Sequence, residues 1–180
     1  MEHLYIPENY LSELSLYDTQ IAIKTVKDFF QQTLAEQLYL LRVSAPLFVR
    51  PESGLNDNLN GVERPVSFGI KEQNDRPVEI VHSLAKWKRN ALKQYGFHVG
   101  EGLYTDMNAI RRDEITDNVH SIYVDQWDWE KIILKQDRNV EYLKETVRKI
   151  YKALKKTEKY MAIKYDYIEE ILPKDIFFIT

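Results

Sequence analysis

One segment, residues 139–164, constrains the fold more than any other part of the sequence. Apolar residues recur there at every third or fourth position, which predicts a long amphipathic helix. These residues are Val140, Leu143, Val147, Ile150, Leu154 and Met161. The opposite face is basic, a feature that can mark nucleic-acid or membrane binding. Because acidic residues are interspersed and the net charge is −3, we interpret it instead as a solvated outer face.

A second helix is expected from about Asp18 to Leu38, with Asp18 as its N-cap. Residues 40–49 are typical of a strand, which Pro46 should bend or place at a sheet edge because proline cannot donate to a ladder. The polar residues 51–64 predict a loop.

The middle of the chain alternates short strands with one helix. Residues 66–70 and 78–82 predict a hairpin around a turn at 74–77. Ser83 is expected to cap a helix over residues 84–95, ended by Gly96. Gly100 and Gly102 open a further segment. The last expected strands are residues 121–129 and a strand-like run over residues 176–180.

The composition excludes several classes of site. The chain of 180 residues contains no cysteine, which rules out disulfides, thiolate metal sites and a cysteine nucleophile. Its apolar runs are far shorter than the ~20 residues that span a bilayer, and the first ten residues do not resemble a signal peptide. We therefore expect one domain over residues 1–180, in a cytoplasmic setting and without nucleic-acid or membrane partners.

Two segments are dense in chemically useful side chains. Residues 82–89 run from a strand end into a helix start, where backbone N–H groups, lysine and arginine favour anions. The alternative is a capped surface helix with exposed basic residues. In the strand at 120–130, Gln126, Asp128 and Glu130 share one face. That face is either the wall of a polar pocket or the wet side of a strand whose aromatic side enters the core.

Two polar stretches have weaker implications. Arg111-Arg112-Asp113-Glu114 is either a solvated turn or an arginine fork for phosphate beside an acidic base or metal ligand. Residues 56–61, with Asn, Asp and Gly, are typical of a turn. No phosphate-loop, dinucleotide or HExxH motif is present, and the four histidines are scattered. The residues alone therefore predict only a polar pocket that favours anions.

Together, five strings in this order resemble ammonia-dependent asparagine synthetase (aspartate–ammonia ligase). They are Asp57-Asn58-Leu59, His82 to Arg89, Gly100 to Thr105, Ile110 to Glu114, and His120 to Glu130. The resemblance implies an α+β fold like the class II aminoacyl-tRNA synthetases, an antiparallel sheet flanked by helices. It also implies that residues 18–49 match the dimer-forming first motif of that class.

The resemblance further implies a reaction. The β-carboxylate of aspartate attacks the α-phosphate of ATP, giving β-aspartyl-AMP and pyrophosphate, and ammonia then displaces AMP to give asparagine. ATP and Mg²⁺ are the implied cofactors. Arg111 would grip the α-phosphate and the reacting carboxylate, and Asp113 or Glu114 would lie near adenine or metal. The implied aspartate-binding residues are Asp57, Ser83, Lys88, Gln126 and Asp128.

One departure from the family affects the expected activity. The family's chains run further and carry a glycine-rich third motif and later acidic residues that have no counterpart in this sequence. We therefore expect a truncated catalytic domain that is inactive, or nearly so, by itself. Two alternatives are a related aminoacyl-tRNA synthetase core and a non-catalytic fragment or paralogue that binds ligand or only dimerises.

Overall fold

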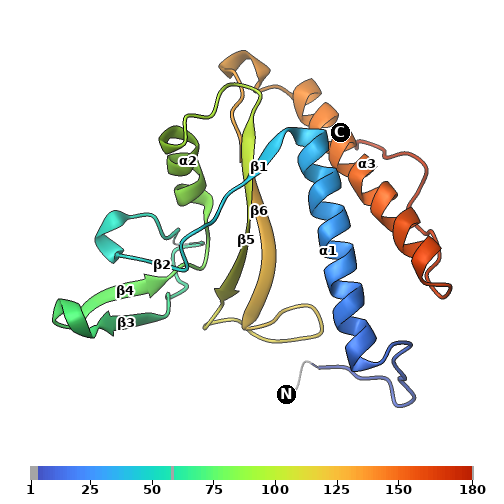
Figure 1. Ribbon diagram of the computed structural model, residues 1–180, viewed down its shortest axis with the longest axis horizontal. Helices are drawn as coiled ribbons and strands as arrows, with labels where there is room; N and C mark the ends of the chain where they lie inside the picture. The colour runs from blue at the N-terminus through green and yellow to red at the C-terminus, as the bar shows by residue number, and fades with distance from the viewer. Residues whose placement is uncertain (1–3, 58, 180) are drawn as a thin grey trace. The chain divides into compact units, whose positions relative to one another are not determined.

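The computed structural model describes residues 4–57 and 59–179 (Figure 1). Asn58 in the expected loop and Thr180 in the expected last strand lie outside the described residues. The contacts divide the chain into two compact units. The first holds residues 4–8, 41–57, 59–98 and 102–132, and the second holds residues 9–40, 99–101 and 133–179. The single domain expected over residues 1–180 stays a prediction.

The first unit contains two three-stranded sheets, except that the first strand begins one residue before segment 41–57, at Leu40. One has the order β1-β5-β6, formed by Leu40–Arg42, Gly102–Ile110 and Tyr123–Lys131. The other has the order β2-β4-β3, formed by Phe48–Val49, Arg76–Ile80 and Ser67–Ile70. The pairs β5–β6, β3–β4 and β2–β4 are antiparallel, so the expected α+β fold with antiparallel sheets is confirmed.

The core of this unit lies between β5 and helix α2 (Ala85–Gln94). Alternate residues of β5 point to one face and are buried, and the apolar side of α2 packs against them. The main members are Leu103, Met107 and Ala109 of β5 and Trp87, Ala91 and Leu92 of α2. The sequence did not identify residues 102–110 as a strand, although the buried alternation is clear once the partner helix is seen.

The register of the β5–β6 pair determines which face of β6 points toward this core. Leu103 pairs with Glu130, Thr105 with Asp128 and Met107 with Gln126. Residues directly opposite in an antiparallel pair share a face. The polar side of β6 therefore lies on the side that α2 covers, and the strand is not a simple one with a wet polar side and an aromatic core side.

The small sheet confirms the expected hairpin with shifted bounds. The turn forms from a 3₁₀ helix, Lys71–Gln73, followed by Asn74 and Asp75, which both have positive φ. Arg76 and Pro77, expected in the turn, lie instead at the start of β4. Proline is tolerated because β2 pairs with β4 only at Glu79 and Ile80, which leaves the side of the strand opposite β3 unpaired at Pro77.

The second unit is built on two long helices, α1 (Leu16–Leu38) and α3 (Val140–Lys164), which pack together (Figure 1). Both helices were predicted from their apolar spacing. Leu34 and Leu38 of α1 are buried, as are Ala153 and Met161 of α3. The rings of Phe29 and Tyr160 stack with centroids 4.0 Å apart.

Three local expectations were wrong. The N-cap of α1 is Ser15, whose hydroxyl accepts from the backbone N–H of Asp18, so Asp18 lies inside the first turn. The N-cap position of α2 is Leu84 and not Ser83, although the Ser83 hydroxyl accepts from the backbone N–H of Ala85 at 3.5 Å. Residues 176–179 form no strand.

The remaining helical segments are short. Two more 3₁₀ helices lie at Pro51–Ser53 and Lys135–Asp137. In the described part of the chain, no helix is long and apolar enough to cross a bilayer.

Candidate functional site

Lys88 of α2 lies at the centre of a charged cluster between this helix and β6. The helix buries this lysine to 5% exposure, and its ammonium forms an ion pair with Asp128 of β6. The same nitrogen donates to the carbonyl of Trp129 at 3.0 Å and lies 3.5 Å from Glu130 Oε2. A buried ammonium needs such compensation, because charge removed from water is otherwise costly. Lys88 and Asp128, 40 residues apart, are thus brought together as the resemblance implied.

Gln126 is the next residue toward the β5–β6 turn on the same face of β6. Its amide nitrogen lies 3.2 Å from the sulfur of Met107, the residue opposite it in register. A thioether is a weak acceptor, so the amide keeps hydrogen-bonding capacity for another group. Gln126, Asp128 and Lys88 therefore form one polar patch on the face of the sheet that α2 covers.

Asp57 and Ser83 form a second group at the end of β4. The Ser83 hydroxyl is 3.5 Å from Asp57 Oδ2, and the Lys86 ammonium is 3.7 Å from Asp57 Oδ1. The imidazole Nε2 of the buried His82 lies 2.6 Å from the Asp57 carbonyl. Because a carbonyl only accepts, Nε2 must carry a proton.

Asn56 holds this second group in place. Its amide donates to the carbonyl of Ile80 and to Glu79, each at 3.3 Å, and its carbonyl oxygen accepts from the backbone N–H of His82 at 3.1 Å. The side chain is 7% exposed. Using both ends of one amide inside the protein fixes the loop that carries Asp57 against the strand that leads to Ser83.

Arg111 directly follows β5 and begins the predicted turn. The backbone N–H of Glu114 donates to the carbonyl of Arg111 at 3.1 Å, which confirms a turn over residues 111–114. Arg111 Nε is buried, and within residues 4–57 and 59–179 it has no hydrogen-bond partner. A buried guanidinium N–H without an acceptor is costly. An unsatisfied buried group of this kind calls for an explanation, and it makes Arg111 a candidate for binding an anionic oxygen.

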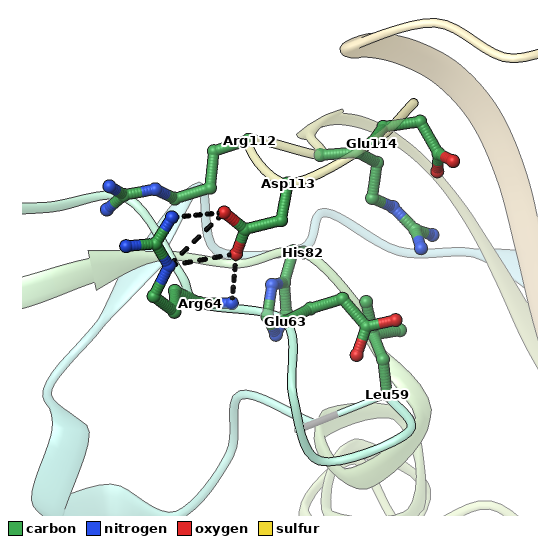
Figure 2. A pocket seen from close by; sticks show the side chains of 8 residues that line it. Leu59, Glu63, Arg64, His82, Arg112, Asp113 and Glu114 are labelled. Atoms are coloured by element: carbon green, nitrogen blue, oxygen red, sulfur yellow. Dashed lines mark hydrogen bonds and ion pairs between the residues drawn. The ribbon is translucent and has the colours of Figure 1, made fainter. Parts of the chain in front are cut away.

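Arg111 is one of the residues that line a small pocket of about 70 Å³ (Figure 2). The lining residues are Leu59, Glu63, Arg64, His82, Arg111, Arg112, Asp113 and Glu114. Small-molecule sites usually enclose ~300 Å³ or more, so the pocket has room for one small group and not for a whole nucleotide. His82 lines this pocket and also contacts the backbone of Asp57, so it connects the second group to the Arg111 pocket.

Asp113 is fully engaged by Arg64. Figure 2 shows its carboxylate directed at the Arg64 guanidinium, whereas the carboxylate of Glu114 points away from this pair. Arg64 Nε donates to the two carboxylate oxygens at 3.2 and 3.1 Å, and the backbone N–H of Arg64 donates at 2.8 Å. The side-chain and backbone hydrogen bonds from Arg64 lower the pKa of Asp113 to about 2.

The predicted site residues therefore fall into three groups within the first unit. Lys88, Gln126 and Asp128 form one, Asp57 and Ser83 another, and Arg111, Asp113 and Glu114 the third. Among the described residues, no three His, Asp or Glu side chains gather closely enough to hold a metal ion. Sequence reasoning missed Arg64, Asn56 and the role of His82, because their partners all lie at least 23 residues away.

Comparison with known proteins decides the family. The family model described as aspartate-ammonia ligase matches residues 17–180. The chain belongs to the aspartate–ammonia ligase family. It is 65% identical over 179 residues to the aspartate–ammonia ligase of Clostridium tetani, covering 99% of this chain and 52% of that protein. Over 180 residues it is 64% identical to the Clostridium perfringens ligase, covering all of this chain and 54% of the relative.

Two further observations bear on this family assignment. A ligase from Lactobacillus johnsonii is 58% identical over 98% of this chain and 53% of its own length, so the chain spans about half the length of the curated relatives that it matches. Among solved structures, the pyrrolysyl tRNA synthetase PylSc of Desulfitobacterium hafniense matches with a TM-score of 0.52 at 11% identity. The match covers 74% of this chain and 45% of that one. The predicted class II synthetase-like fold is thereby confirmed.

Proposed function

We propose that the chain works in the ATP-dependent amidation of L-aspartate by ammonia. The observation that carries the proposal is the buried Arg111 Nε, which lies in a family-matched turn without a partner in the described chain. In the first step, an oxygen of the substrate β-carboxylate bonds to the α-phosphorus of ATP and pyrophosphate leaves. In the second, ammonia nitrogen bonds to the β-carbonyl carbon of β-aspartyl-AMP, AMP leaves and a proton is lost, giving L-asparagine.

Arg111 is assigned to the phosphoryl group. Its Nε can donate to an α-phosphate oxygen, and a guanidinium can donate a second N–H in parallel. Such a fixed donor stabilises the charge that builds up as the carboxylate attacks. The small pocket fits a single phosphate-sized group, so we assign to it only the reacting end of the nucleotide.

The aspartate is assigned to the groups around Asp128 and Asp57. Lys88 is already paired with Asp128 and close to Glu130, so we propose that it orients Asp128. Asp128 would then accept from the α-ammonium of the substrate, with Gln126 and Ser83 supplying neutral hydrogen bonds. The side chain of Asp57 lies between Ser83 and Lys86 and would complete this side.

Mg²⁺, adenine binding, dimerisation and location stay predictions. Among the described residues no three carboxylate or imidazole groups gather closely enough to hold a metal ion, and we derive no step through magnesium. Asp113 is saturated by Arg64, so we assign adenine to Glu114. We propose a homodimer formed through residues 18–49, in the cytoplasm where ATP is available.

A chimera tests the function. The chain is joined to the part of the Clostridium perfringens ligase that extends beyond the match, and AMP and asparagine are measured with ATP, Mg²⁺, aspartate and ammonium. We expect turnover, with Arg111→Ala lowering it by about 10²- to 10³-fold, the usual cost of removing a donor to developing charge.

Arg76→Ala is the matched control, because Arg76 pairs with Glu52 on the surface of the same unit away from the pocket. It should keep full turnover. A folded chimera without turnover beside an active perfringens enzyme would refute the proposed reaction, and an active Arg111→Ala chimera would refute the assigned role.

A further inference from the structure

Two segments far apart in the sequence meet beside the candidate phosphate pocket. Residues 64 and 65 contact residues 112 and 113 through several bonds. Besides the bonds from Arg64 to Asp113, Arg112 Nη1 lies 3.4 Å from the carbonyl of Pro65. The Asp113 carboxylate accepts hydrogen bonds from both the backbone N–H and the guanidinium of Arg64. These bonds fix the orientation of the carboxylate as well as its position.

These contacts act on the turn that carries Arg111. The turn is anchored at its base, where the backbone N–H of Arg111 donates to the carbonyl of Ile122 at 2.7 Å. Its tip, at residues 112 and 113, is exposed and held from outside the turn by Arg64 and Pro65. Without that second anchor the tip would be a short solvent-exposed turn. Its backbone could then change conformation, and the orientation of the Arg111 side chain would change with it.

Stability alone does not account for the Arg64–Asp113 contact. The Arg64 side chain is 67% exposed and that of Asp113 is 24% exposed, and ion pairs with a largely exposed partner usually contribute little to folding. Yet both residues line the pocket that Arg111 lines. Because the pair adds little stability and lies in the pocket wall, we attribute to it the role of placing the neighbouring Arg111.

We propose that Arg64 and Asp113 are positioning residues, a latch that holds the 111–114 turn so that the Arg111 side chain stays at the pocket assigned to the phosphoryl group. The inference rests on the proposed function for the identity of that group. The latch itself can be tested without any ligand.

The ligand-free test is amide hydrogen exchange on this chain. Arg64→Ala and Asp113→Asn should each speed exchange of the Glu114 amide, which closes the turn, by about tenfold or more. Arg76→Ala, which removes an arginine from another surface ion pair, should leave that amide unchanged. Unchanged exchange in both latch variants would overturn the latch.

Kinetics of the chimera then separate positioning from a structural role. Arg64→Ala should lower kcat about tenfold, as expected when a reacting group loses its alignment, with the KM for aspartate unchanged. The paired swap of Arg64→Asp with Asp113→Arg should recover part of that loss. Wild-type kcat in Arg64→Ala, or equal losses in every kinetic parameter without rescue, would overturn the proposal.

The two proposals fail in different ways. If the wild-type chimera makes no asparagine but the latch variants loosen the turn, the latch stands and the proposed reaction falls. If the chimera is active and Arg111→Ala is inactive, while the latch variants exchange and react like wild type, the reaction stands and the latch falls.

Discussion

Lys88 is a buried cation that two carboxylates of the first unit share. Replacing it with methionine keeps most of the volume but leaves Asp128 and Glu130 without their shared cation. Breaking a buried pair costs about 3–5 kcal/mol; the two carboxylates are 28–30% exposed, so we expect a loss of about 2 kcal/mol for Lys88→Met. Urea unfolding of the two proteins measures it.

The control is an exposed pair of the same chemistry. Lys24 and Asp28 pair on α1 with side chains 75% and 50% exposed, so Lys24→Met should cost no more than about 0.5 kcal/mol. Equal losses in the two variants would show that Lys88 has no special burial cost.

His120 gives the loop between β5 and β6 a dependence on pH. Its ring Nδ1 lies 2.9 Å from both carboxylate oxygens of Asp117, and this hydrogen bond raises the pKa of His120 above 6.5. A raised pKa means that the stabilisation is complete below about 6.5 and is lost as pH rises through the folded-state pKa. We expect Asp117→Asn to lower the NMR titration midpoint of His120.

Glu114→Gln is the comparison for that titration. Its charge also raises the pKa of His120, but more weakly than Asp117 does, so it should move the midpoint less. A midpoint that does not respond to Asp117→Asn would rule out the pairing in solution.

At the scale of single residues, the sequence predicts which residues belong to the site better than it predicts which residues contact each other. Asp57 and Ser83, and Lys88 and Asp128, were expected at one substrate and do contact each other in pairs. Asp113 was expected near adenine or metal, and nothing in residues 111–114 indicates that Arg64, 49 residues earlier, engages it. Such contacts depend on the folded path of two loops, which no local pattern encodes.

At the scale of elements, the first turn of α1 offers a clean prediction. The Ser15 hydroxyl accepts from the backbone N–H of Asp18 at 3.1 Å and donates to the Asp18 carboxylate at 2.6 Å. Removing an N-cap hydroxyl typically costs about 1 kcal/mol, so Ser15→Ala should lower the free energy of unfolding by that amount. Ser15→Thr keeps the oxygen and should cost clearly less. Equal effects of alanine and threonine in urea unfolding would contradict the cap.

Element types follow from periodicity where one face is buried in regular fashion. The ends of the two long helices were predicted to within two residues, because apolar spacing is an average over many turns. β5 was missed because Thr105 and Met107 alternate with Tyr104 and Asp106, a mixture whose burial depends on α2. Cap positions were wrong because several serines and aspartates near a helix start could each serve, and the backbone decides among them.

At the scale of the whole molecule, the prediction concerns activity of the 180-residue chain by itself. Its described site residues form three groups, and the pocket of about 70 Å³ that Arg111 lines cannot enclose a nucleotide. The relatives that it matches are about twice as long. We therefore expect no asparagine or AMP above background from ATP, Mg²⁺, aspartate and ammonium, with the Clostridium tetani ligase as the positive control. Asparagine formation by the chain, abolished in Arg111→Ala, would contradict this expectation and show that these three groups suffice for catalysis.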